Sequence, residues 1–306
     1  MRILFAGTPM IAVPTLCALN RHFEIGAVLT NPDRPQKRKA SLVFSPVKEQ
    51  ALTLGLPVLQ FEHLGSKERG MIQEYHCDTL VCFAYGKFFG PKFLSLFPYA
   101  QLNIHPSLLP ELRGPSPIQG AILKELDQTG ISLQAIASEM DSGAIAAVTR
   151  FPLDGTETVD SLTEKVSQLA ASLAVDTLSR PLVFTPQRGE PSYTRMVSHQ
   201  DGIINWGQSA HSINAQVRGM YPWPKASTVY KGEVLFICAV DKDCSQPVPP
   251  GFSCGSVVAR DKKKGVAIAT SEGLLWVTRL QRQMKNEMDA LAFVNGDNAF
   301  LTAKLG

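Results

Sequence analysis

An amide and an imidazole stand two residues apart at the end of a predicted strand. The strand covers residues 101–104 and contains Asn103, and it is followed at once by His105 and Pro106. Side chains two positions apart on a strand point to the same side of the sheet. Because proline has no N–H to offer a sheet, Pro106 should end the strand. The spacing therefore predicts that Asn103 and His105 converge on one reacting atom.

The loop after this strand is predicted to be rigid and uncharged at its start. Its rigidity comes from three prolines, Pro110, Pro115 and Pro117. The stretch at 107–110, Ser-Leu-Leu-Pro, predicts a wall against which a flat, partly apolar ligand could lie. Its two leucines could equally be ordinary core residues.

Short apolar runs alternate with amphipathic ones through the first two thirds of the chain. The predicted strands lie at residues 3–5, 25–29, 79–84, 101–104, 131–137 and 144–151. The predicted helices lie at residues 10–19, 46–54, 117–127 and 161–178. This alternation predicts an α/β fold with a doubly wound, Rossmann-like, mostly parallel sheet. Such sheets bind ligands beyond the carboxyl ends of their strands, where Asn103 and His105 stand.

The last third of the chain is β-rich. After a predicted helix at 209–219, short strands are expected at residues 227–230, 234–240, 256–259, 266–269 and 274–280. Five short strands in about a hundred residues predict a small β-barrel of the oligonucleotide-binding type. Prolines and a glycine interrupt all periodicity between residues 181 and 200. We expect an α/β domain at 1–188, a linker at 189–205 and a C-terminal barrel domain at 206–306.

Composition narrows the class of protein. Hydrophobic residues make up 44% and charged residues 19% of the 306 residues, as in ordinary globular proteins. Six scattered cysteines without Cys-x-x-Cys pairs indicate reduced thiols in an intracellular protein. No apolar run approaches the ~18 residues of a membrane helix. We expect a cytoplasmic monomer, or a protein of an organelle matrix if a presequence has been removed.

Four motifs together resemble the signature of the folate-dependent formyltransferases. They are Asn-x-His at 103–105, Ser-Leu-Leu-Pro at 107–110, Arg-Gly-x-x-Pro-Ile at 113–118 and Asp-Ser-Gly at 141–143. The resemblance implies that Asn103, His105 and Asp141 are catalytic. It also implies 10-formyltetrahydrofolate as the formyl donor, no metal, and a folate site lined by Ser107, Leu108, Leu109 and Pro110.

The tail resembles the branch of this family that formylates methionyl initiator tRNA. Tyr-Pro-Trp-Pro at 221–224 and Gly-Leu-Leu at 273–275 match that branch, and formyltransferases of purine precursors lack this tail. In that branch a basic loop contacts the acceptor end of the tRNA. The corresponding residues here are Arg34, Lys37, Arg38 and Lys39, and Arg38 aligns with the key arginine. Judged from its residues alone, this loop would be a solvated basic loop.

The implied reaction assigns a role to each catalytic residue. An amine attacks the formyl carbon, and donors aimed at the developing oxyanion supply the largest share of catalysis. Asn103 and His105 are the expected donors. A carboxylate near His105 favours its protonated form, fixes its tautomer and can accept the proton of the amine. We expect Asp141 to do this.

Several residues depart from the family pattern, and two alternatives stay open. The departures are Lys37, Lys39, Ala40 and Ser41 in the basic loop, and Pro106, Ala144 and Met196 elsewhere. The first alternative is a formyltransferase acting on an amino-sugar nucleotide. The second is a non-catalytic relative that binds folate or RNA. The tail motifs and the basic loop favour initiator tRNA, for translation initiation, over both.

Overall fold

A computed structural model describes residues 1–35 and 42–306 of the chain, which divide into two compact units. The first unit comprises Met1–Pro117, Thr129–Phe151 and Thr163–Thr194. The second comprises Ile118–Gln128, Pro152–Leu162 and Arg195–Gly306. The second unit therefore takes two short pieces from within the first 162 residues of the chain.

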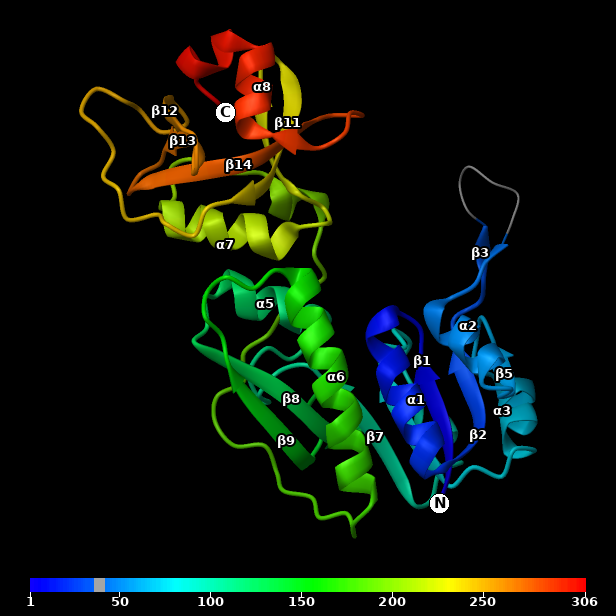
Figure 1. Ribbon diagram of the computed structural model, residues 1–306. Coiled ribbons are helices and arrows are strands. Elements are labelled where there is room, and N and C mark those ends of the chain that lie inside the picture. Colours follow the sequence, from blue (N-terminus) through cyan, green and yellow to red (C-terminus); the bar gives the residue numbers. More distant parts are fainter. Residues whose placement is uncertain (36–41) are drawn as a thin grey trace. The chain divides into compact units, whose positions relative to one another are not determined.

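A seven-stranded sheet with the order β5-β2-β1-β6-β7-β8-β9 forms the centre of the first unit (Figure 1). Its strands are β1 (Arg2–Gly7), β2 (Glu24–Thr30), β5 (Val58–Gln60), β6 (Thr79–Phe83), β7 (Ala100–His105), β8 (Gln128–Ala135) and β9 (Ile145–Pro152). The first five strands of this order run parallel, and β8 runs antiparallel to β7. The predicted mostly parallel sheet is confirmed.

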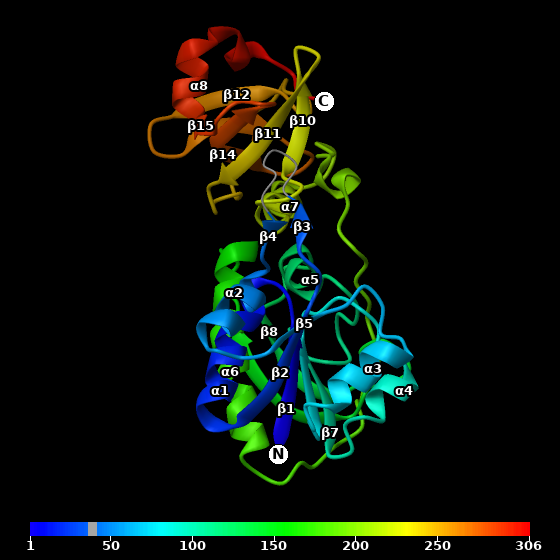
Figure 2. The same cartoon turned by 90° about the vertical axis from the view of Figure 1, so that its right-hand side faces the viewer.

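Helices cover both faces of this sheet. They are η1 (Met10–Ala12), α1 (Val13–His22), α2 (Pro46–Thr53), α3 (Ser66–Gln73), α4 (Pro91–Leu94) and α6 (Val159–Leu178). Figure 2 shows α1, α2 and α6 on one face and α3 and α4 on the other. Strands β1, β2 and β6 are buried almost throughout, which explains their uninterrupted apolar sequences. Ser45 caps α2, since its Oγ accepts a hydrogen bond from Lys48 N at 3.1 Å.

The second unit contains an antiparallel sheet with the order β10-β11-β14-β13-β12, and β15 pairs with β14. Its strands are β10 (Ala226–Tyr230), β11 (Glu233–Val240), β12 (Val257–Asp261), β13 (Gly265–Ala269), β14 (Leu274–Arg282) and β15 (Met288–Asp289). Its helical elements are α5 (Pro117–Leu123), η2 (His199–Gly202), α7 (Ala210–Met220), α8 (Ala290–Gly296) and η3 (Asn298–Thr302). The five strands predicted in the tail are all present, each within two residues at its ends.

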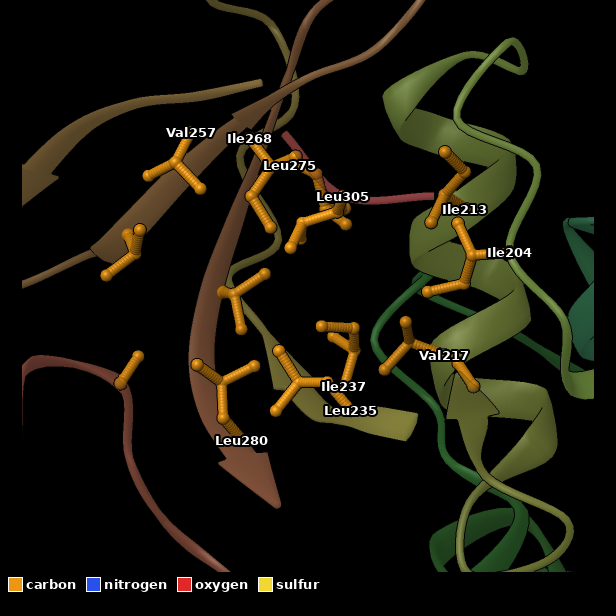
Figure 3. Packing of buried hydrophobic residues seen from close by; sticks show 14 of the residues in the cluster. Ile204, Ile213, Val217, Leu235, Ile237, Val257, Ile268, Leu275, Leu280 and Leu305 are labelled. Carbon is orange, nitrogen blue, oxygen red and sulfur yellow. The ribbon is translucent and has the colours of Figure 1, made fainter. Parts of the chain in front are cut away.

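The core of the second unit forms between α7 and the sheet. Figure 3 shows Ile213 and Val217 of α7 facing the sheet, with Val217 toward Leu235 and Ile237 of β11. All four side chains are at most 1% exposed. The helix predicted at 209–219 is therefore present, and it buries one face against the sheet.

One predicted helix is shorter in the structure, and the predicted basic loop lies partly outside the described residues. The helix expected at 117–127 ends at Leu123, because Glu125 adopts the left-handed backbone conformation at φ 48°. The basic loop begins in the two-stranded ladder of β3 (Arg34–Pro35) and β4 (Leu42–Val43). Lys37, Arg38, Lys39, Ala40 and Ser41 lie outside the described residues. Within residues 1–35 and 42–306, no helix is long and apolar enough to cross a membrane.

Candidate active site

Asn103 and His105 occupy the carboxyl end of β7, as their spacing predicts. Asn103 lies beside Cys82 of β6 on one side and Gln134 of β8 on the other. His105 faces Ser132 of β8 in the same ladder. The parallel strands β6 and β7 both end here, so the two side chains stand at the edge where such sheets bind ligands.

The structure brings the third predicted residue, Asp141, to this pair from the loop between β8 and β9. Asn103 Nδ2 donates to Asp141 Oδ1 at 3.4 Å, and His105 Nδ1 lies 3.5 Å from Asp141 Oδ2. Two further donors hold the carboxylate, the Gly114 backbone N at 2.8 Å and Gln134 Nε2 at 3.0 Å. The side chain of Asp141 is only 11% exposed. Three hydrogen-bond donors thus orient the carboxylate beside His105.

The loop that carries Asp141 needs the glycine that follows it. Asp141 itself adopts φ 54°, a conformation that costs a non-glycine residue about 1–2 kcal/mol. A Cβ on Gly143 would lie 1.7 Å from the carbonyl oxygen of Ala135 at the end of β8. Only glycine allows this close approach of the loop to the strand. The Asp-Ser-Gly motif is therefore explained by the shape of the turn.

The tautomer of His105 is set by a backbone carbonyl. His105 Nε2 lies 2.9 Å from the oxygen of Leu112, which can only accept, so Nε2 carries the proton. In the neutral ring Nδ1 is then unprotonated, and it faces Asp141. Burial lowers the pKa of His105, and the carboxylate of Asp141 and the carbonyl of Leu112 oppose this effect only in part. Of the two forms expected for His105, the geometry favours the neutral ring, because burial outweighs the carboxylate.

The neighbouring cysteine carries no charge. Burial raises the pKa of Cys82 to about 12, and the nearby carboxylate of Asp141 adds to the effect. Its sulfur therefore remains a thiol at neutral pH and is a poor nucleophile. Acid–base chemistry at this edge falls to His105 and Asp141.

The predicted ligand wall at 107–110 has its side chains largely turned inward. Ser107 is fully buried, and Leu108 and Leu109 are each 8% exposed. Ser132 Oγ donates to the Ser107 carbonyl at 2.8 Å and accepts from Leu109 N at 3.1 Å. These bonds join the loop to β8 directly behind His105.

Two glutamines around Asp141 were not predicted from the sequence. Gln134 lies on β8 and donates to the carboxylate, while Gln187 Nε2 donates to the backbone carbonyls of Asp141 and Gly143, both at 2.8 Å. A signal for Gln134 exists, because Ser132 and Gln134 break an apolar strand at a spacing of two and must share a face. No local pattern marks Gln187.

Comparison with known proteins identifies the family. The "Formyl transferase" model matches residues 1–178, and the "Formyl transferase, C-terminal domain" model matches residues 196–298. The methionyl-tRNA formyltransferase of Treponema denticola is 36% identical over 320 residues, covering 98% of each chain. That of Bacillus licheniformis is 34% identical over 314 residues, covering 100% of this chain and 98% of the other.

Solved structures share the fold at lower identity. HypX from Aquifex aeolicus in complex with tetrahydrofolic acid has a TM-score of 0.65 at 18% identity. The match covers 96% of this chain and 47% of HypX, so the chain spans about half the length of that protein. An N-formyltransferase from Helicobacter canadensis, in complex with folinic acid and dTDP-3-aminofucose, has a TM-score of 0.64 at 17% identity over 92% of this chain and 98% of its own. The family expected from the motifs is confirmed: the chain belongs to the formyl transferase family and aligns from end to end with its methionyl-tRNA formyltransferases.

Proposed function

We propose that this protein transfers the formyl group of 10-formyltetrahydrofolate to the α-amino group of methionyl initiator tRNA, acting as a cytoplasmic monomer. The observation that carries the proposal is the convergence of Asn103, His105 and Asp141 at the carboxyl end of β7. The choice of acceptor rests on relatives named methionyl-tRNA formyltransferase, which match both the α/β part and the tail.

His105 accepts the proton of the attacking amine. The neutral Nδ1 is the free nitrogen of the ring, and the α-amine, with a pKa of roughly 8, is partly unprotonated at working pH. As the amine nitrogen bonds to the formyl carbon, its proton passes to Nδ1. The resulting imidazolium lies between the carboxylate of Asp141 at 3.5 Å and the carbonyl of Leu112 at 2.9 Å. Both neighbours stabilise the positive charge.

Asn103 stabilises the oxyanion of the tetrahedral intermediate. One N–H of Nδ2 points to Asp141 Oδ1, which leaves the second for the substrate oxygen. A donor in such a position contributes on the order of 3–4 kcal/mol. When the carbonyl forms again, the bond from carbon to the folate N10 breaks and His105 returns its proton to that nitrogen. Formyl-methionyl-tRNA and tetrahydrofolate leave, and the ring is neutral again.

Substrate binding is assigned to three regions. We propose that Ser107, Leu108, Leu109 and Pro110 line the folate site, chiefly through the loop backbone because both leucines are largely buried. We propose that Arg34, Lys37, Arg38 and Lys39 contact phosphates near the acceptor end of the tRNA. The domain limits proposed are 1–188 for catalysis, 189–205 for the linker and 206–306 for a barrel that binds tRNA.

A formyltransferase acting on an amino-sugar nucleotide is the main rival. The Helicobacter canadensis enzyme shares the fold of this chain with a TM-score of 0.64, and its complex holds such a nucleotide. The fold therefore does not discriminate between the acceptors. A non-catalytic relative that binds folate or RNA is the second rival.

One assay distinguishes the proposed function from its two rivals. Formyl incorporation from 10-formyltetrahydrofolate is measured with methionyl initiator tRNA, with methionyl elongator tRNA and with an amino-sugar nucleotide. Formylation of the initiator tRNA above both others supports the proposal. Formylation of the sugar nucleotide alone refutes the proposed acceptor. Folate binding without formylation of any acceptor refutes catalysis.

A further inference from the structure

The segment that leaves the first unit is bonded to both loops of the active site. We call residues 185–194 the strap. At its start, Thr185 and Ile145 exchange two backbone hydrogen bonds of 2.9 and 2.8 Å, just beyond the Asp141 turn. At its end, Leu112 N donates to Ser192 Oγ at 2.9 Å, and Thr194 N donates to the Arg113 carbonyl at 2.7 Å. The strap thus spans from the loop of Asp141 to the loop that holds His105.

A glutamine of the strap turns toward the loop of Asp141. Residues 183–186 and 188–190 are exposed, whereas Gln187 between them is half-buried. Its Nε2 lies 2.8 Å from the carbonyl oxygens of both Asp141 and Gly143. Its Oε1 accepts from Arg113 Nε at 3.2 Å and from a terminal guanidinium nitrogen of Arg113 at 2.7 Å. Carbonyls only accept and guanidinium only donates, so these partners leave one orientation for the amide.

These contacts restrain the turn that aims the carboxylate. Asp141 is held at a positive φ that is unfavourable for an aspartate on its own. Gln187 bonds the backbone at Asp141 and again at Gly143, so it closes the turn across Ser142. Gln134 and Gly114 then act on the carboxylate oxygens themselves. Gln187 therefore restrains the backbone of the turn directly, and it also donates to Gln134 Oε1 at 3.3 Å, the glutamine that holds the carboxylate.

We propose that Gln187, oriented by Arg113, is a positioning residue for formyl transfer: it fixes the Asp141 turn so that the carboxylate stays beside His105 Nδ1. The inference rests on the proposed function. It assigns a role in catalysis to the strap, which joins the α/β part of the chain to its tail. Gln187 itself does not reach the reacting atoms.

Two substitutions remove the restraint in different ways. Gln187→Ala removes all five side-chain hydrogen bonds, including the one donated to Gln134 Oε1 at 3.3 Å. Gln187→Glu keeps the shape and the partner for Arg113, but the ionised carboxylate cannot donate to the carbonyls of Asp141 and Gly143. Thr185→Val is the matched control, since it removes a strap hydroxyl that donates to the Ile145 carbonyl at 3.3 Å, away from the carboxylate.

Steady-state formylation of methionyl initiator tRNA is measured for each variant across pH. We expect kcat to fall about 10- to 100-fold in both Gln187 variants, with the KM for each substrate within about twofold of wild type. In Gln187→Ala, the loosened Asp141 opposes the effect of burial less, so the pKa of His105 falls and the acid limb of kcat moves to lower pH. Gln187→Glu should recover activity as the introduced carboxyl gains a proton and can donate again.

Three results would overturn the inference. They are a kcat within about twofold of wild type in a folded Gln187 variant, an equal loss in Thr185→Val, and a lower melting temperature with an unchanged pH profile of kcat. Wild-type protein that formylates no tRNA refutes the proposed function instead. The two failures are therefore distinguishable.

Discussion

Replacing Asp141 with asparagine removes one charge from the site and keeps the shape of the side chain. In the wild-type protein the carboxylate lies 3.5 Å from His105 Nδ1, where the positive charge develops during transfer. At an effective dielectric constant of about 20, two unit charges at this separation attract by about 5 kcal/mol. The loss of this attraction raises the barrier, so kcat should fall by about three orders of magnitude. The KM for 10-formyltetrahydrofolate should change little.

The measurement is the single-turnover rate of formylation of methionyl initiator tRNA at saturating 10-formyltetrahydrofolate. Glu139→Gln is the control, because Glu139 lies on the same loop, is exposed and loses the same charge. Its rate should stay within about twofold of wild type, since solvent screens exposed charges. A folded Asp141→Asn variant that keeps more than about a tenth of the wild-type rate would refute the electrostatic role. A comparable loss in Glu139→Gln would show that the effect is not local.

Three other predictions concern the pH response, the turn and the basic loop. Burial lowers the pKa of His105, so below about pH 6.5 the unfolded chain binds a proton that the native residue does not. The contribution of His105 to the free energy of unfolding is therefore complete above about pH 6.5 and decreases below it. Chemical denaturation at two pH values should show a smaller decrease in His105→Gln than in the wild-type protein. Gly143→Ala places a Cβ against the Ala135 carbonyl oxygen, so it should lower the free energy of unfolding by about 1–3 kcal/mol and remove most of the activity. Unchanged stability in chemical denaturation would contradict the close approach. Arg38→Ala should raise the KM for tRNA and lower the slope of log K against log salt concentration by about one, with kcat unchanged; an unchanged salt slope would contradict a phosphate contact.

Local sequence patterns predicted most elements because their causes are local. The apolar runs of β1, β2 and β6 are buried where the sequence is continuously apolar. Proline and serine at the start of α2 act within one turn of the helix. The end of α5 was misjudged, since the positive φ of Glu125 that stops it leaves no mark in the residue type.

The sequence by itself determined the chemistry available at the site, and the tertiary structure decided how it is held and charged. Asn103 and His105 share a side of β7 because strand geometry alternates side chains, whatever surrounds the strand. The partners of Asp141 come from positions 7 to 46 residues away, and only packing of the sheet and the strap brings them together. The neutral state of His105 is likewise a result of burial, and burial is a property of the folded chain that no spacing of residues can express.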